Sequence, residues 1–220
     1  MRLGGVTALV RLADEWEQQR TMCIDVLCAY LRMPFDPDDE TTKGESEVRL
    51  TIIRSIKEHL VKDPVVSWHG HRFDFTGTRF YGGDFAGIVV PTGTDLVFRD
   101  VHFSGGEVWF GEAKFSGGEV WFDEAKFSGG TVSFDRATFS GSTVSFDGAE
   151  FLSRRVDFSK AIFETVPSGL PDHDTDVVKL PGGQLLKQDT EDDNREETSD
   201  GDDQPGQPDH DDPEEGPSES

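Results

Sequence analysis

Histidine and acidic side chains are the groups in this chain that could perform chemistry, and their spacing limits what that chemistry could be. His69 and His71 lie two residues apart, so in an extended segment both would face one side, as two ligands of a metal ion would. No cysteine and no third histidine lies near them in the sequence. We therefore expect a turn with polar side chains at this position and no metal site.

Four carboxylates in the middle of the chain, Glu112, Asp123, Glu124 and Asp135, could pair as the two acids of a glycosidase do. They occupy spacer positions that should face solvent, and a solvated surface explains them more simply. The Ser-Gly-Gly turns lack the GxxxxGK[ST] pattern of a phosphate-binding loop. The sequence thus predicts no catalytic residue, no cofactor and no enzymatic activity.

The charge of the chain excludes several classes of partner. With 44 acidic and 21 basic residues its formal charge is -23, which opposes direct binding to nucleic acids or anionic membranes. No apolar run approaches the roughly 20 residues of a membrane-spanning helix, and no secretion signal is recognisable. Cys23 and Cys28 have neither redox nor zinc spacing, so we expect reduced thiols in a cytoplasmic protein.

The two ends of the chain differ in pattern. Residues 1–65 predict three amphipathic helices, over 3–16, 22–31 and 46–60, with Ser46 as the N-cap of the third. Residues 171–220 carry 18 acidic and 3 basic residues and no aromatic residue, and they predict a disordered acidic tail. Within this tail, 177–186 is weakly apolar, but we do not expect it to join the folded part.

The middle of the chain consists of a 12-residue repeat. The sequence FSGGEVWFGEAK starts at Phe103 and recurs in modified form at the four positions that follow at this period: Phe115, Phe127, Phe139 and Phe151. Within each repeat the phenylalanines are spaced by seven and then five residues, and a small or β-branched residue precedes each by two. Self-similarity at a fixed period indicates a solenoid.

These units resemble the pentapeptide-repeat family. Residues 113–117 (AKFSG), 120–124 (VWFDE) and 137–141 (ATFSG) match its pattern of a small residue, a spacer, Leu or Phe, and two polar residues. The resemblance covers about residues 72–165 and is specific, because many consecutive units obey it. The N-terminal segment also resembles that of larger bacterial pentapeptide proteins, some with membrane helices upstream, so this chain is interpreted as a shortened relative.

The resemblance implies a mainly β fold: a right-handed, four-sided β-helix of about four coils over residues 66–170, capped by the helical module 1–65. It also implies a non-enzymatic role as a protein-interaction or scaffold module with an unidentified protein partner. Two alternatives follow from the family. One is a DNA-mimic protein that binds a topoisomerase such as gyrase, and the other is the regulatory part of a membrane-associated protein whose membrane segment is absent here.

The charges allow an independent test of the coil. If two repeats make one turn, Glu112 stacks on Arg136 and Lys126 stacks on Glu150, with opposite charges adjacent. A 12-residue turn would instead stack Glu on Glu and Lys on Lys. The 24-residue turn leaves one unfavourable pair, Asp123 with Asp147. The charges therefore favour the four-sided coil.

The 24-residue register predicts that phenylalanine rings form ladders inside the coil. The predicted ladder residues are Phe103, Phe110, Phe115, Phe122, Phe127, Phe134, Phe139, Phe146, Phe151, Phe158 and Phe163. Trp109 and Trp121 occupy outward positions where later repeats have serine, and exposed aromatic residues on rigid surfaces are favoured at protein interfaces. We take these two as the candidate interaction residues; burial against the coil wall is the alternative, and they should lie on opposite sides.

Overall fold

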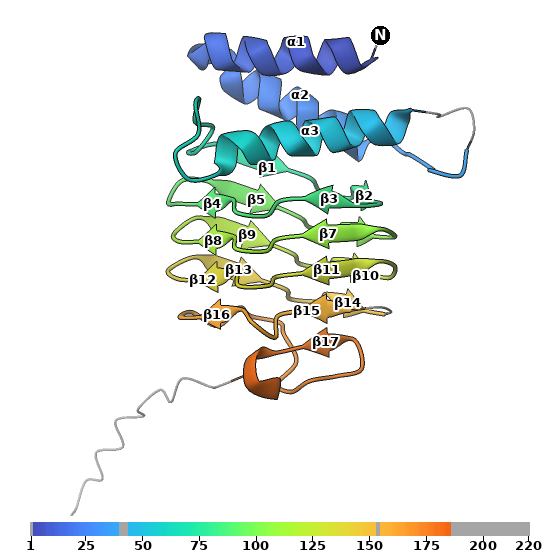
Figure 1. Ribbon diagram of the computed structural model, residues 1–220, viewed down its shortest axis with the longest axis vertical. Helices are drawn as coiled ribbons and strands as arrows, with labels where there is room; N and C mark the ends of the chain where they lie inside the picture. Colours follow the sequence, from blue (N-terminus) through green and yellow to red (C-terminus); the bar gives the residue numbers. More distant parts are fainter. Residues whose placement is uncertain (1, 40–43, 153–154, 186–220) are drawn as a thin grey trace, which may run out of the picture. The chain divides into compact units, whose positions relative to one another are not determined.

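The computed structural model describes residues 2–39, 44–152 and 155–185. Three helices come first: α1 (Arg2–Glu15), α2 (Arg20–Arg32) and α3 (Glu45–Leu60), with the short 3-10 helix η1 (Glu17–Gln19) between α1 and α2. Sixteen short strands, β1 to β16, follow in four coils (Figure 1). The predicted four-sided β-helix of about four coils with N-terminal helices is confirmed.

Each side of the coil is a parallel sheet whose strands come from successive turns. The first sheet holds β1 (Arg72–Asp74), β5 (Asp95–Val97), β9 (Glu119–Trp121) and β13 (Thr143–Ser145). The second holds β2 (Arg79–Phe80), β6 (His102–Phe103), β10 (Lys126–Phe127) and β14 (Glu150–Phe151). The third holds β3 (Gly83–Asp84), β7 (Glu107–Trp109), β11 (Thr131–Ser133), β15 (Val156–Asp157) and β17 (Val178–Lys179). The fourth holds β4 (Val89–Val90), β8 (Lys114–Phe115), β12 (Thr138–Phe139) and β16 (Ile162–Phe163).

The strands keep the 24-residue register from turn to turn wherever the 12-residue repeat is intact. Lys126 pairs with Glu150 and Val132 with Val156 in the backbone ladders. The first coil departs from this register, because Asp95, the partner of Arg72, comes one position early and Val108, the partner of Gly83, comes one position late. Residues upstream of Phe103 lack the exact repeat. The first coil fits this different sequence because one of its sides is shorter and another is longer than in the later coils.

The interior of the coil is a column of phenylalanine rings. Among the predicted ladder residues, rings one turn apart lie nearly parallel with centroids 4.4–5.0 Å apart in the pairs Phe103–Phe127, Phe127–Phe151, Phe110–Phe134, Phe134–Phe158 and Phe122–Phe146. Phe115 and Phe139 also stack, whereas Phe163, at the end of its column, meets Phe139 edge-on. Neighbouring columns meet edge to face, an arrangement that aromatic quadrupoles favour.

The corners of the coil require backbone with positive φ, and glycine supplies only part of them. Gly77, Gly87 and Gly148 fill three corners, but Asp100, Glu112, Glu124 and Arg136 adopt positive φ at four others. Left-handed backbone is unfavourable for residues with a Cβ atom. The coil therefore holds these four charged residues in a conformation that they would avoid in an unfolded chain.

Two expectations about segment ends need correction. Helix α3 starts at Glu45 after Gly44, whose φ is 86°, and Ser46 lies inside the helix and is not its N-cap. Residues 171–185, expected to belong to the tail, continue the coil: β17 pairs with β15, and the side chains of Val178 and Leu180 are buried. These two apolar residues cover the last turn on one side, which explains why a short acidic segment is ordered. The rest of the predicted tail, 186–220, lies outside the described residues.

Candidate functional site: the outer surface of the coil and its junction with the helices

The eleven predicted ladder residues point into the coil, so none of them is available for contact with a partner. Nine are buried, and Phe151 and Phe163 are partly buried at the last turn. Among the described residues, the column contains phenylalanine rings and small apolar side chains at each level. Function at the coil must therefore come from its outer surface.

Trp109 and Trp121 share the sequence Glu-Val-Trp-Phe but differ in their surroundings. Trp109 lies in β7 with 42% of its surface exposed, beside a shallow hollow whose other lining residues include Gly87, Gly111, Glu112, Asp135 and Arg136. Trp121 lies in β9, in the sheet on the opposite side of the coil. The guanidinium groups of Arg72 and Arg99 lie 5.5 and 4.9 Å from its ring centroid. Trp121 is thus partly covered by its own chain, whereas Trp109 is more open to solvent.

Three of the four carboxylates considered for catalysis, Glu112, Asp123 and Asp135, are paired with cations. Arg136 binds Glu112 at 2.8 Å and Asp135 at 3.2 Å, and Lys160 binds Asp135 at 3.1 Å. Arg99 binds Asp123 at 3.2 Å, and the Ser145 hydroxyl donates to the same carboxylate. Lys126 lies 3.5 Å from Glu150, as the 24-residue register predicts. Pairing of this kind is typical of a solvated ladder, in which each exposed pair adds about 0.2–1 kcal/mol.

His69 and His71 contact the surrounding chain and do not converge with other ligands. The ring nitrogens of His69 lie 3.0 Å from the Ser67 hydroxyl and 3.1 Å from the Leu60 carbonyl. Nδ1 of His71 lies 3.1 Å from the Thr21 hydroxyl of α2, and burial, reinforced by Arg20, lowers the pKa of His71. In the part of the chain that the structure describes, no group of three His, Cys, Asp or Glu side chains could hold a metal ion.

A polar cluster between the helices and the first coil was not expected from the sequence. Nε1 of Trp68 donates to Asp14 at 3.0 Å, and Nε2 of His59 lies 3.0 Å from the same carboxylate oxygen. The rings of His59 and Trp68 stack with centroids 4.0 Å apart, and Trp68 is fully buried. This cluster joins α1, α3 and the segment that enters the coil.

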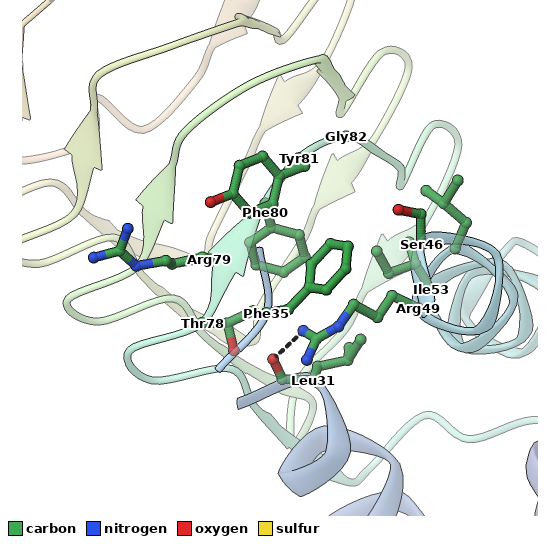
Figure 2. A pocket seen from close by; sticks show the side chains of 11 residues that line it. Leu31, Phe35, Ser46, Arg49, Ile53, Thr78, Arg79, Phe80, Tyr81 and Gly82 are labelled. Atoms are coloured by element: carbon green, nitrogen blue, oxygen red, sulfur yellow. Dashed lines mark hydrogen bonds between the residues drawn. The ribbon is translucent and has the colours of Figure 1, made fainter. Parts of the chain in front are cut away.

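Arg49 of α3 is the second unexpected residue at this junction. Its guanidinium donates to the carbonyl of Leu31 at the end of α2, at 2.7 Å (Figure 2). It also donates to the carbonyl of Met33 at 2.6 Å and binds Glu45 at 3.1 Å. It also lies 4.8 Å from the ring centroid of Phe35. Burial lowers the pKa of Arg49, and the negative charge of Glu45 opposes that effect. The buried Arg49 side chain therefore supplies hydrogen-bond donors to backbone carbonyls at the C-terminal end of α2, which have no partner within the helix.

A small cavity of about 40 Å³ lies next to Arg49, between α3 and the first coil. Its walls are mostly apolar, and Figure 2 shows Phe35, Phe80 and Tyr81 gathered around it. The hydroxyl of Thr78 lines it and has no hydrogen-bond partner within the described residues. The cavity has room for only a few water molecules, and its lining residues include no histidine and no carboxylate.

None of the helices in the described residues is both long and apolar enough to cross a lipid bilayer.

Comparison with known proteins identifies the repeat. Residues 122–167 match the family model described as pentapeptide repeats (9 copies). No curated protein and no solved structure matches the chain. The matched residues span β10 to β16, in which the 24-residue register holds and the phenylalanine columns are continuous. The last two turns of the four-sided β-helix, within residues 122–167, therefore match pentapeptide repeats.

Proposed function

We propose that this chain is a non-enzymatic protein-interaction module that binds its partner through the outer surface of the β-helix, with Trp109 as the anchor. The observation that carries the proposal is the open ring of Trp109 on a rigid sheet. Large aromatic residues dominate the binding energy of many protein interfaces, because they bury much surface at a small cost in conformational entropy. A sheet fixed by ladders on both sides offers such a ring without reorganisation on binding.

The described residues contain no cleft in which reactive groups converge, and this supports a binding role. An enzyme needs reactive groups that converge in a cleft. In the described residues, the cavity at the junction contains no such groups, and Glu112, Asp123 and Asp135 on the coil surface are bound to cations. The pentapeptide-repeat solenoid is in general a non-enzymatic fold, and this chain uses its ordered residues for the coil and its cap.

Trp121 provides a matched control for a test of the proposal. Both tryptophans pair with serine one turn later, Trp109 with Ser133 and Trp121 with Ser145, so serine fits the ladder at either position. We expect Trp109→Ser to reduce the affinity for the partner by tenfold or more. Trp121→Ser should leave the affinity nearly unchanged, because Arg72 and Arg99 already cover that ring.

The experiment captures partners with the tagged full chain, identifies them by mass spectrometry, and measures affinities of both variants by calorimetry with the purified partner. Circular dichroism spectra identical to that of the wild type show that both variants fold. Equal binding by Trp109→Ser and the wild type would contradict the role of Trp109. Loss of binding in Trp121→Ser alone would place the interface on the opposite side of the coil.

The DNA-mimic alternative is less favoured by the charges. A mimic of duplex DNA presents rows of carboxylates that are free to imitate phosphates, whereas here Glu112, Asp123 and Asp135 bind arginine or lysine. Residues 71–170 carry 14 acidic and 9 basic residues, a modest excess. Inhibition of gyrase supercoiling at micromolar concentrations of the chain would reverse this preference.

A further inference from the structure

The chain contains one four-residue sequence twice, and one of the two copies shows which group covers its tryptophan ring. Glu-Val-Trp-Phe occurs at 107–110 and at 119–122, and its first three residues form β7 and β9. In β9 the guanidinium groups of Arg72 and Arg99 lie 5.5 and 4.9 Å from the ring centroid of Trp121. The face of an aromatic ring attracts a guanidinium group within about 6 Å of its centroid. This protein therefore uses arginine to cover a tryptophan in this sequence.

Each of the two arginines on Trp121 also lies beside a carboxylate. Nε of Arg99 lies 3.2 Å from Asp123, and Nη1 of Arg72 lies 4.0 Å from Asp95. A guanidinium group can make both contacts at once, because its flat face stacks on a ring while the N–H groups at its edge bind an acid. The surroundings of Trp121 thus combine an aromatic face with nearby carboxylates, and together these two features favour arginine.

Strand β7 offers the same two features without the cation. Within the described residues, no arginine or lysine lies over the ring of Trp109, whose neighbours one turn before and after are Asp84 and Ser133. Glu107 is exposed on the same outer face of the strand, two residues and about 7 Å before Trp109. Among the described residues, no cation pairs with the Glu107 carboxylate. An aromatic face and an unpaired acid therefore stand side by side and open to solvent.

The cations nearest to this place are engaged elsewhere. Lys57 binds Asp84, and Arg136 binds Glu112. The charge of Glu107 is thus left for a group from outside the chain. The formal charge of -23 of the whole chain acts in the same direction, because it attracts a basic partner and speeds the first encounter.

We propose that the partner places an arginine side chain here, with its guanidinium group stacked on Trp109 and bonded to the carboxylate of Glu107. This inference rests on the proposed function, because it names the group that the Trp109 anchor receives. The partner surface is accordingly basic at this point. Arginine is favoured over lysine, because an ammonium group has no flat face with which to stack on the ring while it binds the acid.

Titration of the ¹⁵N-labelled full chain with a five-residue peptide of alternating glycine and arginine, followed by NMR, tests the proposal. The indole N–H signal of Trp109, assigned through its absence in Trp109→Ser, should shift and saturate at millimolar peptide. Citrulline has the flat shape of arginine without its charge, so the same peptide with citrulline should bind at least fivefold more weakly. The peptide with lysine should bind at least twofold more weakly. The indole signal of Trp121 should move little with any of the three peptides, because arginines already lie on its ring.

Two matched variants separate the local contact from the net charge of the chain. Glu107→Gln should weaken binding of the arginine peptide at Trp109 about threefold, as expected for the loss of one exposed ion pair. Glu119→Gln removes the same charge from the equivalent position before Trp121 and should leave binding at Trp109 unchanged. Melting curves equal to that of the wild type show that both variants fold.

The arginine assignment would be overturned if the arginine peptide left the Trp109 signal unmoved, or if the citrulline or lysine peptide bound equally well. Equal effects of Glu107→Gln and Glu119→Gln would also overturn it. The peptide titration does not require the natural partner, so the two proposals can fail separately. If the captured partner loses affinity for Trp109→Ser while the arginine peptide fails, the Trp109 anchor stands and the arginine assignment falls.

Discussion

The repeated coils and the junction with the helices are stabilised in different ways. In coils two to four the same contacts recur from turn to turn, with rings stacked along each column and meeting rings of the neighbouring columns edge to face. At the junction each contact occurs once: Trp68 with Asp14, His59 with Trp68, and Arg49 with the end of α2. The coil therefore combines many similar apolar contacts, whereas the junction depends on a few polar groups that have no substitutes. Substitutions in the two regions should therefore differ in how much they lower the free energy of unfolding and in how much of the chain they destabilise.

The largest effect is expected inside the coil. Phe122 stacks on Phe98 and Phe146 at 4.9 and 4.7 Å and meets Phe110 and Phe134 edge-on. Phe122→Ala removes a fully buried ring and leaves a cavity that rigid neighbours cannot fill, which should reduce the free energy of unfolding by about 4 kcal/mol. Urea denaturation followed by circular dichroism measures this loss. Phe163→Ala, at a partly buried site, should cost less than half as much; equal costs would contradict the idea of a stacked column.

The next effect is at Arg49. Arg49→Met keeps much of the side-chain volume but removes the buried cation beside Glu45, which retains Arg2 and the Tyr30 hydroxyl as partners, and leaves the carbonyls of Leu31 and Met33 without their donor. Loss of these charged hydrogen bonds should destabilise the helical module by about 2 kcal/mol. Hydrogen exchange should show loss of protection in 2–60 while the amides of coils two to four remain protected. Uniform loss of protection along the chain would mean that the module and the coil unfold as one unit. Glu45→Gln, which leaves Arg49 a neutral acceptor, should have a smaller effect.

The coil was predictable from the sequence, because every contact is encoded several times. The repeat predicted a solenoid, the charges of Glu112 with Arg136 and of Lys126 with Glu150 favoured the 24-residue turn, and the spacing of the phenylalanines then placed the columns. The junction was not predictable, since the sequence around Trp68 or Arg49 does not indicate which distant groups they meet. Strand β17 was not predictable for the same reason. Val178 and Leu180 lie in a strongly acidic segment, and they are buried because they pack on the open end of the coil.

The same reasoning applies to the two candidate tryptophans. Because they stand one repeat apart, which is half a turn of the coil, the sequence predicted opposite sides, and the structure places them in opposite sheets. Which of the two is covered could not be derived from the local sequence, because it depends on what lies above each ring. Arg72 and Arg99 belong to the turns above Trp121, whereas the residue paired with Trp109 in the turn above is Asp84.

A smaller effect on stability is expected at alkaline pH, and it arises in the helical module and not in the coil. Burial raises the pKa of the Cys28 thiol in α2 to about 12, above its ordinary value of 9.0. Because the unfolded chain ionises first, the stability that this thiol contributes is present below pH 9.0 and is lost as pH rises toward 12. At pH 10 the loss should be about 1 kcal/mol. The difference in unfolding free energy between the wild type and Cys28→Ala should therefore shrink between pH 8 and pH 10. A difference that is independent of pH would contradict the burial of the thiol.

The smallest effect on stability is expected at a corner of the coil. Here the sign of the stability change, and not its size, tests the prediction. Glu124 has a φ of 57°, and Gly148 occupies the corresponding corner one turn later with a φ of 70°. Glu124→Gly removes the unfavourable contact of Cβ with its own backbone but increases the entropy of the unfolded chain, so the net gain should be at most about 1 kcal/mol. The reverse change, Gly148→Glu, should cost a similar amount. Thermal melts of both variants measure the two shifts, which should have opposite signs; destabilisation by Glu124→Gly would mean that this carboxylate stabilises its corner more than the backbone conformation costs.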